Sequence, residues 1–249
     1  MSIDLGLQQH ADALLADRSG AIVLLNAQSG EILAIASHPS FDPNRLDEQA
    51  TALIKDPQSP LLDRAAQELY PAGAAMQDWL LSIGLPANPT SGAVNQIYAG
   101  LGFYTTPDLR LPVAAAVKSG SPLRISPLQG ALAAAAFSHA GLRPPARLAM
   151  AVKAPVQGWV VLPPLSQPIQ ALPSGLSDSA AQARRIANQP FWQWSGPAGT
   201  TGNPISWALA GSLPNAQGTP LAVVVLLEDA NQQWAAYIGQ QLLTATMQP

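Results

Sequence analysis

The sequence contains no cysteine, and this absence removes several classes of site at once. Without thiols the chain cannot form a disulfide framework, a thiol nucleophile or a cysteine-based zinc site. Its three histidines, His10, His38 and His139, are far apart, and none stands in an HExxH-like spacing. We therefore expect neither a metal site nor a bound cofactor.

The chain also carries little charge. Charged residues make up 11% of the 249 residues, the formal net charge is −3, and no basic run is present, so nucleic acid is not expected as a partner. No apolar run approaches the roughly 20 residues that a membrane-spanning helix needs. The most apolar run, "PLAVVVLL" at Pro220–Leu227, has instead the length of a buried strand.

Helix and strand signals are clearest toward the two ends of the chain. An amphipathic pattern predicts a helix over residues 3–15, and two β-rich runs around "AQSG" predict a hairpin over residues 20–38. Ser126 as N-cap and Pro127 in the first turn predict a further helix. The end of the chain is typical of three strands followed by a helix. This order favours one antiparallel sheet covered by helices.

The middle of the chain gives weaker signals. Residues 62–83 are predicted to form two helices separated by a break at Pro71–Gly73. Prolines and few periodic runs between residues 84 and 123 predict loops. Residues 152–175, "VKAPVQGWVVLPPLSQPIQALPSG", are interpreted as an irregular connection, and an exposed surface for a partner is the less favoured alternative.

Five segments together resemble one known family. They are "SIDLGLQQHADALL" (residues 2–15), "SGAIVLLNAQSGEILAIASHPSFDPN" (19–44), "LLDRAAQELYPAGAAMQ" (61–77), "ISPLQGALAAAAFSHAGLRPPARLAMAV" (125–152) and "SGPAGTTGNPISWALAGSLP" (195–214). They resemble, in order, segments of the transpeptidase domain of penicillin-binding proteins, which belongs to the superfamily of serine β-lactamases and D,D-peptidases. The resemblance implies a mixed α/β (α+β) fold with a central antiparallel sheet of about five strands flanked by helices.

The resemblance also implies how the chain is organised. Residues 1–249 are expected to form a single transpeptidase-like domain. Residues 1–47 and 190–249 would build the sheet with the N- and C-terminal helices, and residues 48–189 would hold a helical subdomain and irregular connections.

The helical subdomain is expected to be reduced. Only 23 residues separate Gln77 from Leu101, where active members of the family have a much longer helical section. A shorter subdomain leaves apolar side chains to be covered by a loop or a partner. We therefore expect an apolar surface patch near Leu80, Leu85 and Tyr104.

The family's catalytic motifs align with residues that lack their chemistry. In the S-x-x-K motif a serine attacks the substrate, and a lysine on the same helix face takes its proton. The aligned residues in this chain are Ala74 and Gln77. The K-T-G-T motif aligns with Pro197, Ala198, Gly199 and Thr200. The intervening S-x-N motif has no counterpart that we can place.

These replacements predict a pseudoenzyme. An alanine methyl group cannot form an acyl-enzyme, and a neutral glutamine cannot act as a general base near pH 7. Proline removes both the cation and a backbone donor from the third motif. We therefore expect no catalytic residue and interpret the six aligned positions as degenerate motif positions.

Other candidate segments have simpler interpretations. "VKSGSP", residues 117–122, is interpreted as a solvated loop, and "SGAVN" at Ser91–Asn95 as a loop whose spacing is wrong for S-x-N. Trp192 and Trp194 should share one strand face and pack in the core. The alternative for these two tryptophans is an aromatic wall that grips a peptide.

The expected function is a catalytically inactive, transpeptidase-like domain that binds or scaffolds in cell-wall (peptidoglycan) synthesis. Alternatives are an active serine acyltransferase or hydrolase, or a β-lactam-binding protein, with a rearranged active site, or a purely structural domain. Expected partners are another cell-wall protein or the peptidoglycan stem peptide. The location implied is extracytoplasmic, in the cell envelope, with membrane attachment only through an upstream anchor outside this chain.

Overall fold

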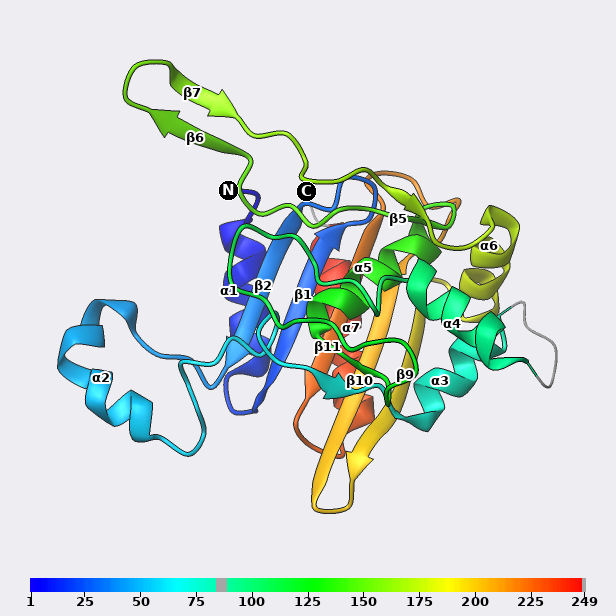
Figure 1. Cartoon of the computed structure of the whole chain (residues 1–249), viewed down its shortest axis with the longest axis horizontal. Coiled ribbons are helices and arrows are strands. Elements are labelled where there is room, and N and C mark those ends of the chain that lie inside the picture. The colour runs from blue at the N-terminus through cyan, green and yellow to red at the C-terminus, as the bar shows by residue number, and fades with distance from the viewer. Residues whose placement is uncertain (84–88, 248–249) are drawn as a thin grey trace.

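A computed structural model describes residues 1–83 and 89–247 and shows a central five-stranded sheet (Figure 1). The strand order is β2-β1-β11-β10-β9, and every neighbouring pair is antiparallel. The strands are β1 (Gly20–Asn26), β2 (Ile32–His38), β9 (Phe191–Thr200), β10 (Asn203–Ser212) and β11 (Leu221–Leu227). The predicted fold class, with an antiparallel sheet of about five strands, is confirmed.

Helices cover both faces of this sheet. α1 (Leu5–Leu15) and α7 (Gln232–Ala245) pack on one face, and α5 (Pro127–Ser138) crosses the other (Figure 1). Because strand side chains alternate between faces, β1 sends Val23 toward α5 and Ile22 toward α1 and α7. All of β11 is buried, as expected for a central strand that is covered on both sides.

α5 is completely enclosed between the sheet and the chain that lies over it. Every residue of α5 is buried, and Ser126 and Gln129 form a reciprocal capping box at its start. The Gln129 amide also donates to the carbonyls of Phe103 and Thr105, at 3.2 and 3.1 Å. The helix predicted after Ser126 is thus confirmed, and its cap also anchors a passing loop.

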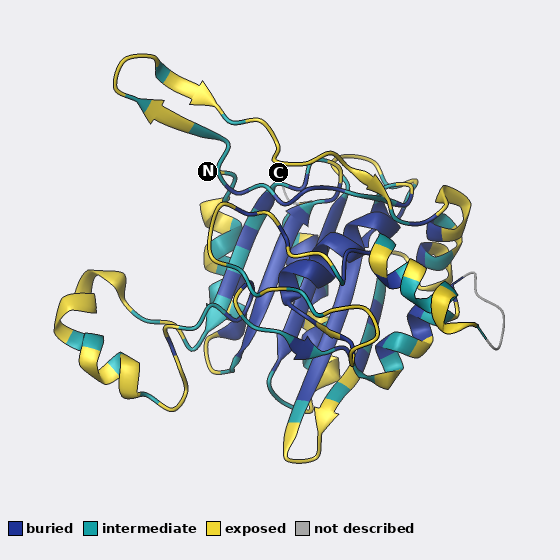
Figure 2. Cartoon of the chain, in the orientation of Figure 1, coloured by how far each residue is buried: buried dark blue, intermediate teal, exposed yellow. Residues whose placement is uncertain are grey.

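The middle of the chain forms short elements around this frame. They are η1 (Pro43–Arg45), α2 (Leu46–Lys55), β3 (Tyr70–Pro71), α3 (Gly73–Leu81), α4 (Ser91–Gly100), β4 (Arg124–Ile125), β5 (Leu142–Arg143), β6 (Ala151–Ala154), β7 (Gly158–Val161), β8 (Ile169–Gln170) and α6 (Ser174–Ala183). β3 pairs with β4, β5 with β8, and β6 with β7. The α2 arm and the β6–β7 hairpin project from the body and are largely exposed (Figure 2). Within the described ranges, no helix combines the length and the apolar character needed to cross a membrane.

The first half of the predicted helix pair at residues 62–83 does not form. Residues 62–69 are in turns and short irregular segments, where the Asp63 carboxylate accepts the N–H of Ala65 and the Ser37 hydroxyl accepts the N–H of Arg64, both at 2.9 Å. Side chains that bind the backbone in this way compete with helical hydrogen bonds. Only the second half, after the break, becomes a helix, α3.

Two segments predicted as loops form regular structure instead. "SGAVN" lies in the first turns of α4, where the Thr90 hydroxyl caps the helix by accepting the N–H of Ala93. "VKAPVQGWVV" closes into the β6–β7 hairpin. Both signals are weak in the sequence, because α4 contains two glycines and each hairpin strand has only 4 residues.

The expected apolar patch is not present at Leu80. This side chain is 2% exposed and belongs to the main core cluster, against which residues of α4 also pack. Tyr104 is half-buried, and its hydroxyl donates to Asn95 on α4 at 3.0 Å. Leu85 lies outside the described residues. Helix α4, which lies in a segment predicted as a loop, therefore covers part of the surface that we expected to be open.

Candidate functional site

The break before α3 is held in place by hydrogen bonds from two sides. The Trp207 indole on β10 donates to the carbonyl of Pro71 at 2.9 Å, and the N–H of Ala72 donates to the carbonyl of Leu123 at 3.1 Å. β3 also pairs with β4 at Tyr70. These contacts fix where α3 begins relative to the sheet.

The first residue of α3 lies directly against strand β9. Gly73 has a φ of +76°, and a Cβ atom at this position would come within 2.8 Å of the Ala198 Cβ and of the Pro197 carbonyl oxygen. From the strand side, a Cβ on Gly196 would lie 3.3 Å from the Ala75 Cβ. Two glycines therefore allow the helix start to contact the strand.

This contact brings the two groups of aligned motif positions together. Ala74 follows Gly73 in the first turn of α3, and the Gln77 amide donates to the Gly73 carbonyl at 3.2 Å. On the other side, residues 197–200 form the end of β9, which is an edge strand and can accept a proline. β9 ends at Thr200, whose hydroxyl accepts the N–H of Asn203 at 3.3 Å.

The six aligned positions have little side-chain chemistry of their own. None carries an ionisable group, and the only side-chain hydroxyl among them belongs to Thr200. The Gln77 amide is used within its own helix. A ligand at this place would therefore meet mainly backbone groups of β9, the Thr200 hydroxyl and side chains from neighbouring elements.

The tryptophans beside the site belong to the core. The ring of Trp79 on α3 stacks on that of Trp194, with centroids 5.2 Å apart and planes at 11°. Trp192 packs against Phe137, and its indole N–H donates to Ser138 at 2.9 Å. All these rings are buried. The core interpretation of Trp192 and Trp194 is confirmed, and the aromatic-wall alternative is wrong for these two residues.

A cavity of about 480 Å³ opens beside the end of β9. Its lining includes Gly199 and Thr200 from β9 and the turn after it, together with Tyr70, Arg124 and Glu228. The Arg124 side chain is exposed and also donates to the Leu69 carbonyl. Sequence reasoning missed the last three residues, because no motif marks them.

Tyr70 and Glu228 in this lining belong to a part-buried cluster with Arg64, which lies behind the cavity wall. One carboxylate oxygen of Glu228 accepts hydrogen bonds from Arg64 Nε at 2.9 Å and from the Tyr70 hydroxyl at 2.8 Å. The remaining guanidinium nitrogens of Arg64 donate to the carbonyls of Ser59 and Gln58. Burial, and after it the hydrogen bond to Glu228, raises the pKa of Tyr70 above its ordinary value. Tyr70 is thus a proton donor here and not a base.

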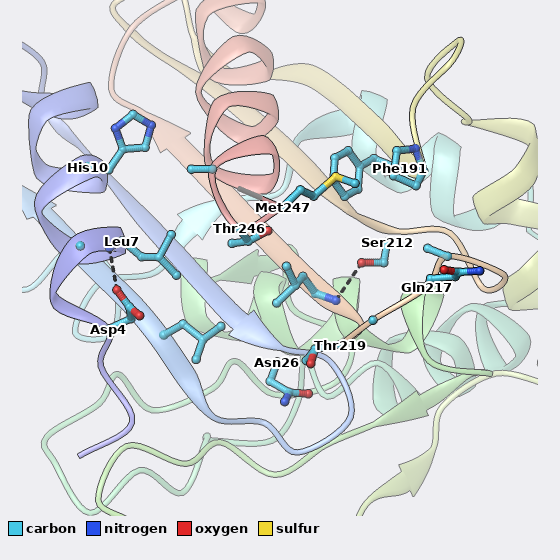
Figure 3. Close-up of a pocket in the computed structure, with 17 residues that line it drawn as sticks. Asp4, Leu7, His10, Asn26, Phe191, Ser212, Gln217, Thr219, Thr246 and Met247 are labelled. Carbon is cyan, nitrogen blue, oxygen red and sulfur yellow. Dashed lines mark hydrogen bonds between the residues drawn. The ribbon is translucent and has the colours of Figure 1, made fainter. Parts of the chain in front are cut away.

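A larger hollow, of about 820 Å³, lies at the opposite end of the sheet between α1 and the end of α7 (Figure 3). Asp4 and Ser212 in its lining already accept the N–H groups of Leu7 and Leu221, each at 3.0 Å. None of the six aligned positions borders it. Among the residues that the structure describes, no three His, Cys, Asp or Glu side chains gather in a way that could hold a metal ion.

Comparison with known proteins agrees with this geometry. The family model "Penicillin binding protein transpeptidase domain" matches residues 20–93. The peptidoglycan D,D-transpeptidase MrdA of Escherichia coli K12 is 35% identical over 92 residues, which are 35% of this chain and 14% of MrdA. This chain therefore matches only a small part of that relative's length.

Solved structures extend the likeness to almost the whole chain. The penicillin G acyl-enzyme complex of penicillin-binding protein A from Mycobacterium tuberculosis has a TM-score of 0.82 at 21% identity, covering 99% of this chain and 80% of that one. The complex between PBP2 and MreC from Helicobacter pylori gives a TM-score of 0.74 at 13% identity. The match covers 98% of this chain and 63% of the PBP2 chain. Residues 20–93 therefore match the model of the penicillin-binding-protein transpeptidase domain, and nearly the whole chain shares its fold.

These relatives correct the expectation that the chain is not an enzyme. The curated relative is named a D,D-transpeptidase, and the solved neighbour was captured as an acyl-enzyme. The pseudoenzyme interpretation is therefore wrong, because the proteins that this chain is similar to are enzymes. A missing side chain excludes only the reaction step that uses that side chain, so Ala74, Gln77 and Pro197 do not settle the activity of the domain.

Replacing Gly73 with alanine should destabilise the fold more than a glycine-to-alanine change at an open position. Gly120 is the matched control: its φ is +85°, and a Cβ there meets nothing within 4 Å. Left-handed strain alone should cost about 1–2 kcal/mol at either position. Crowding against β9 should add about 1–3 kcal/mol to Gly73→Ala. Urea unfolding measures both variants, and equal losses would contradict the close approach of α3 to β9.

The free energy of unfolding should fall at alkaline pH because the buried hydroxyl of Tyr70 keeps its proton in the folded chain. Its pKa is raised in the folded chain above the ordinary value of 10.0, so the folded state keeps a proton that the unfolded chain releases. This contribution to stability is complete below pH 10 and is lost as the pH rises above it, by up to about 1.4 kcal/mol per pH unit. Tyr70→Phe should remove this contribution from the slope of the free energy of unfolding against pH.

The measurement is the free energy of unfolding between pH 8 and pH 11, with Tyr237→Phe as a control that removes a hydroxyl from an exposed position. Tyr98, whose pKa burial raises to about 12, is present in every variant and contributes equally. An unchanged slope in Tyr70→Phe would show that its proton is not held by the cluster with Glu228.

Proposed function

We propose that this chain acts in peptidoglycan synthesis, outside the cytoplasm, as a transpeptidase-type domain that binds the stem peptide at the end of β9. The observation that supports this is the contact of α3 with β9 beside a cavity lined by Gly199, Thr200 and Arg124. In this proposal, residues 1–249 form one domain with a reduced helical subdomain in residues 48–189.

In this proposal the carboxylate end of an extended peptide meets Arg124, in a cavity that the carboxylates of Glu68 and Glu228 also line. β9 is an edge strand, and an edge strand can pair with a peptide through its free backbone groups. Arg124 and the Thr200 hydroxyl supply a cation and a donor at the end of that strand. Arg124 thereby takes the role of a substrate-steering cation, which the proline at position 197 cannot have.

A protein partner in the cell wall is the second part of this proposal. The H. pylori PBP2 with the same fold was solved with MreC. A scaffolding contact of this kind, together with an anchor upstream of this chain, would place the domain at the site of wall assembly.

Acyl transfer by this chain would need a nucleophile other than residue 74. Among the described residues that line the cavity, the hydroxyl groups belong to Thr200 and Tyr70. The Tyr70 hydroxyl keeps its proton in a hydrogen bond to Glu228, which leaves Thr200. Opening of a β-lactam there would join Thr200 Oγ1 to the lactam carbonyl carbon, break the C–N bond and move the hydroxyl proton to the nitrogen. Peptide mapping by mass spectrometry after incubation with penicillin G would locate any adduct.

Calorimetric titration with a short peptide that ends in two D-alanine residues tests the binding proposal. We expect Arg124→Gln to weaken binding by about 10- to 100-fold, because a hydrogen bond to a charged group contributes about 1.5–3 kcal/mol. The matched control is Arg45→Gln in the exposed η1 segment, which should bind as the parent does. A parent chain that does not bind the peptide, or equal binding by Arg124→Gln, would overturn the assignment of this site.

A further inference from the structure

The β6–β7 hairpin is an exposed apolar projection that the proposed function does not use. Figures 1 and 2 show it standing away from the body near the N-terminus, and exposed along most of its length. Val156 at its tip is 91% exposed, Trp159 is 72% exposed and Val161 is 74% exposed. Apolar side chains that are exposed together in this way often mark an interaction site.

Both faces of this hairpin are apolar, and this limits what can cover it. Residues paired across two antiparallel strands share a face. Trp159 pairs with Lys153 and Val161 with Ala151 on one face, while Val160 pairs with Val152 on the other. A protein surface docked on one face would leave the valines or the tryptophan of the other face in water. A medium that surrounds the tip covers both faces at once.

The part of the sequence that contains the hairpin carries positive charge and no negative charge. Residues 109–177 contain six Lys or Arg and no Asp or Glu, although the whole chain has a net charge of −3. Lys153 lies on the hairpin, and Asp108, Arg110 and Arg147 line a small hollow at its base. Arg147 is paired with Glu31 at 3.5 Å, whereas Arg110 is exposed. The hairpin itself therefore carries one cation, Lys153, and no carboxylate.

We propose that the β6–β7 hairpin inserts its tip into the headgroup region of a membrane that contains anionic lipid. Val156 at the tip would enter the apolar boundary to a depth of about 5–10 Å, and Trp159, which is closer to the tip than Val161, would lie at headgroup level, where tryptophan is favoured. Lys153 and Arg110 would contact lipid phosphates. The unpaired backbone groups at the hairpin edges would keep water as their partner, because the headgroup layer is hydrated. This contact belongs to the chain itself and adds to attachment through any upstream anchor.

Vesicle flotation with the purified 249-residue chain tests this inference. We expect the parent to float with vesicles of phosphatidylcholine that contain phosphatidylglycerol. Val156→Asp combined with Trp159→Ser should reduce the bound fraction at least tenfold. Both positions are exposed, so folding should be unaffected, and urea unfolding checks this. The matched control is Ile54→Asp, which alters a 73% exposed apolar side chain on the other projecting arm and should bind as the parent does.

Lys153→Gln separates the electrostatic contribution from the apolar one. It should weaken binding to the anionic vesicles severalfold, and raised salt should do the same. Failure of the parent to bind anionic vesicles, or equal binding by the hairpin variant, would overturn the proposal. So would an equal loss of binding in the Ile54→Asp control. A dimer in analytical ultracentrifugation that Val156→Asp dissociates, without vesicle binding, would instead identify a second copy of the chain as the occupant.

Discussion

The contact between the start of α3 and strand β9 is the constraint on which the rest of the site depends. It leaves no room for a Cβ at Gly73, and a Cβ at Gly196 would crowd Ala75 of α3 at 3.3 Å and, more closely, the Trp194 ring of its own strand. The indole of Trp207 holds the preceding break against the sheet through the Pro71 carbonyl. The aligned positions 74 and 77 on α3 and 197–200 at the end of β9 lie on the two sides of this contact.

Buried charge has a structural role in the same region. Arg64 is almost fully buried, yet its guanidinium is satisfied by Glu228 and by two backbone carbonyls. A buried charge is tolerated only with such partners, because leaving one unpaired costs several kcal/mol. Residues 58–70 have little regular structure, and this cluster ties them to the residue that follows β11. Tyr70 and Glu228 of this cluster also line the cavity next to β9, so structural support and candidate binding surface share residues.

The likeness to the family concerns the fold of this chain, whereas the side chains at the motif positions concern its chemistry. The likeness to penicillin-binding-protein transpeptidase domains consists of the order of segments, the matched residues 20–93 and a fold shared over nearly the whole chain. The side chains at positions 74, 77 and 197 describe one route of catalysis, and their identity does not decide whether the cavity around Arg124 and Thr200 binds or transforms a peptide. The relatives therefore contradict the prediction that the chain is not an enzyme. The projecting hairpin adds a surface that neither the motifs nor the sheet explains.

The sequence by itself determined the parts of the fold that have local signals. An apolar run of strand length predicted the buried β11, alternating β-rich runs around a turn predicted β1 and β2, and Ser126 with Pro127 predicted α5, because strand alternation and N-caps act over a few residues. The order of segments also predicted the six degenerate motif positions by resemblance. Only the tertiary structure decided which residues surround them. Arg64 and Glu228 are 164 positions apart, and Trp207 and Pro71 are 136 apart, so no local pattern records these contacts. Such partners meet because the antiparallel sheet joins the first hairpin to the last strands, and the chain between them must cross its face.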